Sequence, residues 1–84
     1  PALALDGGPD GLTLLRQIIS EAPSLLLENG FLLLETGHDH PHRVADLMAT
    51  SLRDVSIVKD LTGTDRFVVG FRKPGKGRRR SAVA

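Results

Sequence analysis

A run of apolar residues between two glycines, Gly30-Phe31-Leu32-Leu33-Leu34-Glu35-Thr36-Gly37, decides the fold. A short continuous apolar run of this kind is typical of a strand that is covered on both faces, as in a parallel sheet packed between helices. We therefore expect a central strand at residues 31–35, with a loop at its carboxyl end.

A helix is predicted on each side of this strand. Before it, apolar positions recur with helical spacing at Leu12, Leu15, Ile18, Ile19 and Ala22. They predict a helix at about 11–22, capped by Asp10. Pro23 then either kinks this helix or starts a second short turn through residues 24–27, after which residues 28–30 stop the helix. After the strand, Pro41 suits a first helical turn. The inward positions of a second helix, at about 41–52, are Val44, Leu47, Met48 and Leu52.

The remaining sequence predicts an antiparallel hairpin. Residues 54–60 and 66–72 are rich in β-branched and aromatic residues, and Thr62-Gly63-Thr64-Asp65 separates them as a turn. The order allows the last strand to insert between the first two. The predicted fold class is α/β, the second half of an open Rossmann-like sheet whose last strand is antiparallel and inserted.

Charge divides the chain into two parts. Six of the eleven basic residues and no acidic residue lie in the last thirteen positions, whereas residues 1–71 hold five basic and ten acidic residues, a formal charge of −5. Pro74, Gly75 and Gly77 interrupt periodicity there. We expect one domain at 1–72 and a flexible basic tail at 73–84, either a solvated terminus or an arm that binds RNA.

Composition excludes several classes of protein. The chain has 84 residues, 40% of them hydrophobic, and no cysteine. Disulfide frameworks, thiolate metal sites and cysteine nucleophiles are therefore excluded. No apolar run approaches the length of a membrane span, and no signal peptide is expected. The expected compartment is the cytoplasm, with an organelle matrix such as the mitochondrial one as the alternative.

Three motifs in one order carry a resemblance to a known family. They are Leu5-Asp6-Gly7-Gly8-Pro9-Asp10-Gly11-Leu12, then Asn29-Gly30-Phe31-Leu32-Leu33-Leu34-Glu35-Thr36-Gly37, then Lys59-Asp60-Leu61-Thr62-Gly63-Thr64-Asp65-Arg66-Phe67-Val68. Over residues 1–72 the chain resembles the C-terminal part of the HemK/PrmC family, the protein-(glutamine-N5) methyltransferases. The resemblance implies half of a class I methyltransferase domain. It also implies S-adenosyl-L-methionine as methyl donor, and as substrate the glutamine of the Gly-Gly-Gln loop of peptide chain release factors.

The resemblance also implies what this segment lacks. In the family, the glycine-rich cofactor loop, the acidic residue that holds the ribose and the Asn-Pro-Pro-Tyr motif all lie upstream of the Leu-Asp-Gly-Gly loop. None of them is present in this sequence. We therefore assign no catalytic, cofactor-binding or metal-binding residue here, and we expect the isolated chain to be inactive.

Two groups of residues are candidates for the substrate side. The first is the loop Asp6, Gly7, Gly8, Asp10 and Gly11, which alternatively only shapes the start of a helix. The second is Glu35 and Gly37 at the carboxyl end of the central strand, where open α/β sheets bind ligands, with a purely structural strand end as the alternative.

Two further groups have weaker functional interpretations. The hairpin turn offers partner-contact candidates at Asp60, Gly63, Asp65 and Arg66, although an Asp–Arg pair is more often a structural clamp. The loop residues His38, Asp39, His40 and His42 contain metal-binding side-chain types. Their spacing fixes no tetrahedral geometry, so no metal site is assigned.

Two other functions remain open. The chain could be a small non-catalytic α/β interaction module whose basic tail binds RNA or an acidic protein; a steep salt dependence of binding would indicate this. Alternatively, the strand at 31–35 presents an open apolar edge, through which two copies self-associate.

Overall fold

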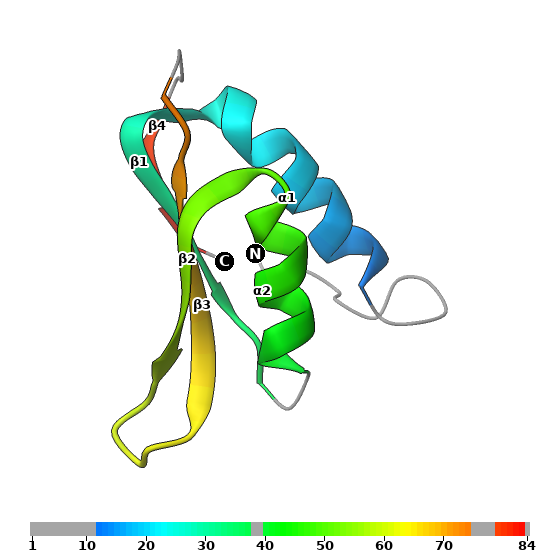
Figure 1. Cartoon of the computed structure of the whole chain (residues 1–84), viewed down its shortest axis with the longest axis vertical. Coiled ribbons are helices and arrows are strands. Elements are labelled where there is room, and N and C mark those ends of the chain that lie inside the picture. Colours follow the sequence, from blue (N-terminus) through cyan, green and yellow to red (C-terminus); the bar gives the residue numbers. More distant parts are fainter. Residues whose placement is uncertain (1–11, 38–39, 75–78, 84) are drawn as a thin grey trace.

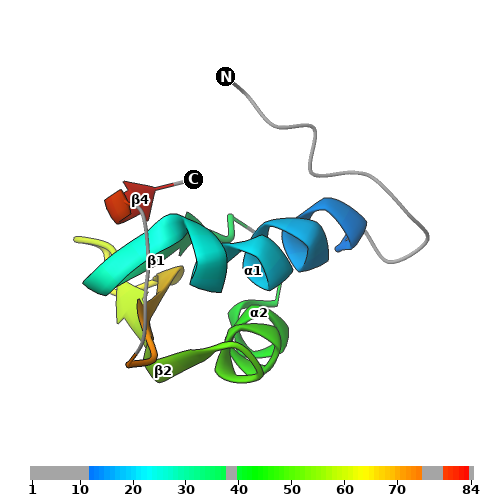
Figure 2. The ribbon, with the colours of Figure 1, turned by 90° about the horizontal axis from the view of Figure 1, so that it is seen from above.

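The fold is one mixed sheet with two helices. The computed structural model describes residues 12–37, 40–74 and, for the backbone alone, 79–83. The elements in chain order are α1 (Thr13–Leu25), β1 (Leu26–Glu35), α2 (Pro41–Ala49), β2 (Leu52–Lys59), β3 (Asp65–Arg72) and β4 (Arg79–Val83). Both helices lie on the same face of the sheet (Figures 1 and 2). Neither helix is long and apolar enough to cross a membrane, within the residues described.

The sheet confirms the α/β class and the inserted last strand of the hairpin. Its order is β2-β3-β1-β4. β3 pairs antiparallel with β1 and with β2, so β1 and β2 run parallel to each other on either side of it. The connection from β1 through α2 to β2 is therefore a crossover between parallel strands, as in α/β sheets.

The central strand begins earlier than its sequence predicts. The segment Glu28-Asn29-Gly30 was expected to stop a helix, but it lies within β1, which starts at Leu26. α1 continues through Pro23 and ends at Leu25, and Leu26 is extended and 1% exposed. Burial of Leu26 in the core explains this early start. Asn29 has a φ of 66°, and this left-handed residue accompanies a shift in register between Leu26 and Phe31.

Both helices in the described part of the chain cover the same face of β1 (Figure 2), whereas the sequence predicts cover on both faces. Leu32 and Leu34 are 3% and 1% exposed and point toward α1 and α2 as part of the core. Phe31 and Leu33 alternate with them and are half-buried. Both described helices lie on the face to which Leu32 and Leu34 point. The apolar run is thus continuous in sequence, but only every second residue of it packs against a described helix.

The core lies between the sheet and the two helices. The predicted positions Leu12, Leu15, Ile19 and Ala22 of α1 are all buried, as are Val44, Met48 and Leu52 from α2 and the start of β2. Leu47, which was also expected to point inward, is half-buried. α2 ends at Ala49 rather than at residue 52 because Leu52 begins β2.

A fourth strand corrects two expectations about the edge and the tail. Residues 73–84 were expected to form a flexible extension, but Arg79–Val83 form β4, which pairs parallel with β1. β1 is therefore an inner strand, and the edge expected to be open for self-association is paired with β4 at Phe31–Leu33. The boundary between domain and tail at residue 72 remains a prediction.

Candidate functional site at the strand ends

The carboxyl end of β1 and the start of β3 lie side by side at one end of the sheet. Glu35 is paired with Phe67 across the ladder. Just beyond it, Thr36 donates from both its backbone N and its Oγ1 to the carbonyl oxygen of Arg66, at 2.8 and 3.1 Å. The structure thus brings Glu35 and Gly37 next to Arg66, two groups of candidates that the sequence separates by about thirty positions.

The turn between β2 and β3 is organised around the carboxylate of Asp60. Asp60 Oδ1 accepts hydrogen bonds from the Thr62 backbone N at 2.8 Å, the Thr64 backbone N at 3.1 Å and the Thr62 hydroxyl. Its second oxygen accepts from Arg66 Nε at 2.9 Å. Asp60 and Arg66 are candidates from the sequence, whereas the two threonines are not among them. The spacing Asp-x-Thr, typical of an Asx turn, is the signal that identifies Thr62.

This arrangement favours the charged form of Asp60. The hydroxyl of Thr62 is the largest cause, followed by the backbone N–H of Thr64, and together with Arg66 they hold the pKa of Asp60 well below its usual range. The ionised carboxylate at the centre of the turn accepts these hydrogen bonds and so fixes the shape of the turn. Gly63 supplies the positive φ of 84° that closes the turn.

The outer surface of the turn is apolar at its tip. Leu61 is fully exposed between Asp60 and Thr62. Beside it, Lys59 and Asp65 form an ion pair at 2.6 Å with side chains that are 63% and 34% exposed. Such exposed pairs contribute at most about 1 kcal/mol, so this pair adds little to the stability of the turn.

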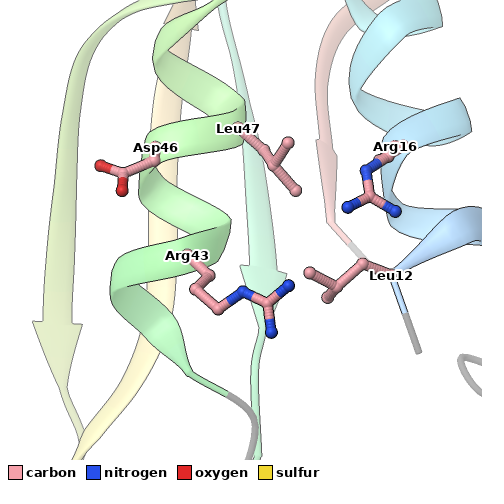
Figure 3. Close-up of a pocket in the computed structure, with 5 residues that line it drawn as sticks. All are labelled: Leu12, Arg16, Arg43, Asp46 and Leu47. Atoms are coloured by element: carbon pink, nitrogen blue, oxygen red, sulfur yellow. The ribbon is translucent and has the colours of Figure 1, made fainter. Parts of the chain in front are cut away.

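A hollow that the sequence did not indicate lies between the two helices. It has a volume of about 230 Å³ and is lined by Leu12, Arg16, Arg43, Asp46 and Leu47. In Figure 3, Arg16 and Arg43 extend from α1 and α2 into the gap between them, whereas Asp46 points away from it. A second hollow of about 220 Å³ shares Arg16 and Leu47 with the first.

Several candidates lie outside the described residues. They are the loop positions Asp6, Gly7, Gly8, Asp10 and Gly11, together with His38 and Asp39. His40 and His42 flank the start of α2 and are exposed. Within the described part of the chain, no three histidine or acidic side chains gather as a metal site would require.

Comparison with curated proteins decides the family. Over 75 residues, the chain is 41% identical to a release factor glutamine methyltransferase of Caulobacter vibrioides, a match that covers 88% of this chain and 26% of the relative. The resemblance to the HemK/PrmC family is confirmed. A release factor glutamine methyltransferase of Thermosynechococcus vestitus is 46% identical over 71 residues, which is 82% of this chain and 24% of the relative. That of Synechocystis is 43% identical over 70 residues.

The match with HemK/PrmC relatives covers nearly all of this chain but little of theirs. The chain spans about a quarter of the length of the curated relatives that it matches. No family model and no solved structure matches it. The similarity is consistent with the C-terminal part of the family, as the order of the three motifs predicts.

Proposed function

We propose that this chain forms the substrate-side part of a methyltransferase that transfers a methyl group to the glutamine side-chain amide of the Gly-Gly-Gln loop of peptide chain release factors. One observation carries the proposal: identities of 41–46% to release factor glutamine methyltransferases extend over 81–88% of the chain in four relatives. S-adenosyl-L-methionine is the methyl donor implied by the family.

The geometry of the strand ends supports this role. In open α/β sheets, ligands bind in the crevice outside the carboxyl ends of the parallel strands. Here β1 and β2 both end at the edge that carries Glu35, Gly37 and the Asp60 turn. Glu35 is exposed there and is available as a hydrogen-bond acceptor for an amide N–H of the substrate.

The described residues do not fit the cofactor. The hollow between α1 and α2 is smaller than the roughly 300–1,000 Å³ typical of small-molecule sites, at about 230 Å³. We therefore assign cofactor binding to a part of the methyltransferase domain other than residues 12–37 and 40–74, and we expect the chain alone to be inactive.

A graft tests the proposed function. Residues 1–72 would replace the matching segment of the Caulobacter relative, and transfer of labelled methyl groups to a purified release factor would be measured. We expect the graft to retain methyl transfer, and the isolated 84-residue chain to show none. A folded graft that binds S-adenosyl-L-methionine but does not methylate the release factor would contradict the proposal.

A matched pair of carboxylates tests the proposed site within that graft. Glu35→Gln removes the acceptor at the carboxyl end of β1, whereas Glu28→Gln changes an exposed carboxylate near the opposite end of the same strand. We expect Glu35→Gln to raise KM for the release factor by about tenfold, the equivalent of one hydrogen bond to a charged group, and Glu28→Gln to leave it unchanged. Equal effects would argue against a substrate contact at Glu35.

A further inference from the structure

The edge of β1 that holds β4 is the place where a strand preceding α1 belongs. β1 and β2 are parallel, and α2 connects them across the face that also carries α1 (Figure 2). Crossovers between parallel strands are right-handed in almost all cases. Both helices lie on one face, so two right-handed crossovers step across the sheet in the same direction. A strand that precedes α1 and runs parallel to β1 must therefore step to β1 in the direction in which β1 steps to β2. This strand thus lies on the side of β1 away from β2, which is the side of β4.

β4 fills this place poorly. Its ladder with β1 joins Leu26 to Arg79 and Phe31–Leu33 to Ser81–Val83, with a shift in register between the two parts. The strand sequence Arg79-Arg80-Ser81-Ala82-Val83 contains one large apolar residue and two adjacent arginines. Parallel strands inside an α/β sheet are rich in valine, isoleucine and leucine instead. The backbone of β4 pairs with β1, but its sequence is poor in the apolar residues typical of such a strand.

The sheet face opposite the helices is unfinished in the same region. Phe31 and Leu33 of β1 are half-buried, and so are Phe67, Val69 and Phe71 of β3. The rings of Phe31 and Phe71 lie 6.1 Å apart, and the Arg53 guanidinium covers Phe71 at 5.5 Å from its centroid. A partner that adds a strand next to β1 and a helical layer over this face would complete both features at once.

We infer that β4 is a replaceable occupant of a strand-docking edge on β1, and that the partner fitting this edge is a parallel apolar strand from the remaining part of a methyltransferase domain. The edge of β1 and the half-buried face beside it are observed in the described residues, whereas the choice of partner rests on the proposed function. β4 must leave before the partner strand can pair, so the apparent affinity for the partner is reduced by the fraction of chains whose edge is free.

Two prolines in β4 test whether it holds the edge. Successive N–H groups of a strand point to opposite sides, so in Ser81→Pro/Ala82→Pro one of the two prolines removes a donor that faces β1. The variant keeps every basic residue, and Ser81→Ala/Ala82→Ser serves as its control. We expect the amides of 31–35 directed toward β4 to exchange hydrogen at least about tenfold faster in the proline variant, while those bonded to β3 keep their protection.

The second measurement concerns the partner. The Caulobacter relative, cut immediately before the segment that matches this chain, would be co-expressed with tagged versions of the full-length chain, and the affinity of the purified complex would be measured. We expect the proline variant to bind at least about tenfold more tightly than the unaltered chain and its control, because its edge is free. The readout is binding without methyl donor or release factor, so it is independent of the proposed activity.

Four outcomes of the exchange and binding measurements would overturn the inference. Unchanged exchange in 31–35 would mean that β4 does not hold the edge. Faster exchange in the proline variant, with partner binding equal to or weaker than that of the unaltered chain, would mean that β4 does not compete with the partner. If neither the variant nor the unaltered chain formed a complex, the edge would not accept the partner strand. A homodimer of the proline variant in place of the complex would assign the edge to a second copy. A tight complex that fails to methylate release factor would contradict only the proposed function.

Discussion

Arg72 Nε donates a hydrogen bond of 2.7 Å to the carbonyl oxygen of Pro23, a residue 49 positions earlier in the chain. The same guanidinium donates from Nη1 to the carbonyl of Lys73 at 3.0 Å. Arg72 is 9% exposed and, among the described residues, has no carboxylate partner. Carbonyl oxygens at the end of α1 carry partial negative charge, which stabilises the buried cation and ties the helix end to the last residue of β3.

Replacement of Arg72 by lysine is therefore expected to be destabilising although it keeps the charge. A lysine has one ammonium group and cannot reproduce the planar fork that reaches two carbonyls. We expect Arg72→Lys to lower the free energy of unfolding by about 1–3 kcal/mol, measured by urea denaturation. Arg53→Lys is the control, because Arg53 is more exposed and donates from Nε to the backbone oxygen of Arg72, not to its guanidinium. Equal losses in the two variants would contradict this role of Arg72.

Gly70 sets the distance between α2 and the sheet. A Cβ at this position would lie 3.0 Å from Met48 Cε and 3.1 Å from Leu52 Cβ and Cδ1. We expect Gly70→Ala to lower the free energy of unfolding by about 1–3 kcal/mol through overpacking, measured by thermal and urea unfolding.

A double-mutant cycle separates this overpacking from other effects of alanine. Met48→Ala opens space beside the new Cβ and by itself is expected to cost about 2–5 kcal/mol. Because the two side chains would meet, the double variant should lose less stability than the sum of the single losses. Additive losses would show that contact with Met48 is not the cause.

The turn at Asp60 predicts a dependence of stability on pH. The folded-state pKa of Asp60 lies below its unfolded value of about 3.9, so the unfolded chain binds more protons in acid. Its contribution to stability is complete above the unfolded value and is lost as the pH falls through the folded one. Asp60→Asn should lower stability at neutral pH and flatten the decline below about pH 4. Urea unfolding across this range measures both effects.

Asp65→Asn is the matched control for this experiment. Asp65 lies in the same turn, but its carboxylate contacts the exposed Lys59 rather than the turn backbone. This variant is expected to keep most of the acid-dependent loss seen in the unaltered chain. If stability depended less on pH in Asp65→Asn but was unchanged in its pH dependence in Asp60→Asn, the effect would come from Asp65 and not from Asp60.

Thr36 links the end of β1 to the start of β3. Its side chain is buried, with the residue 6% exposed, and its hydroxyl donates to the Arg66 carbonyl at 3.1 Å. Thr36→Val keeps the shape and the backbone hydrogen bond but loses the hydroxyl, so we expect a loss of about 0.5–1.5 kcal/mol in urea unfolding. Thr50→Val, which removes an exposed hydroxyl bonded to Leu47, should cost less because water replaces that bond.

The sequence by itself determined the alternation of elements and most of the core. Helical spacing placed Leu15, Ile19 and Ala22 inward, and the residues around Gly63 predicted the hairpin, because periodicity and turn chemistry are local properties. The motif order also identified the HemK/PrmC family. These conclusions need no knowledge of which strands are neighbours.

Only the tertiary structure decided which strands and side chains meet. Thr36 finds Arg66, and Arg72 finds Pro23, through pairing between distant segments that no local pattern specifies. The apolar run at Phe31 and Leu33 predicted two covered faces, but composition cannot show whether a covering layer is present. For the same reason the basic segment Arg79–Val83 gave no strand signal. Its pairing with β1 depends on the edge that β1 offers, and this edge exists only once the sheet has formed. Strand formation therefore depends on the neighbouring strand as well as on the local sequence.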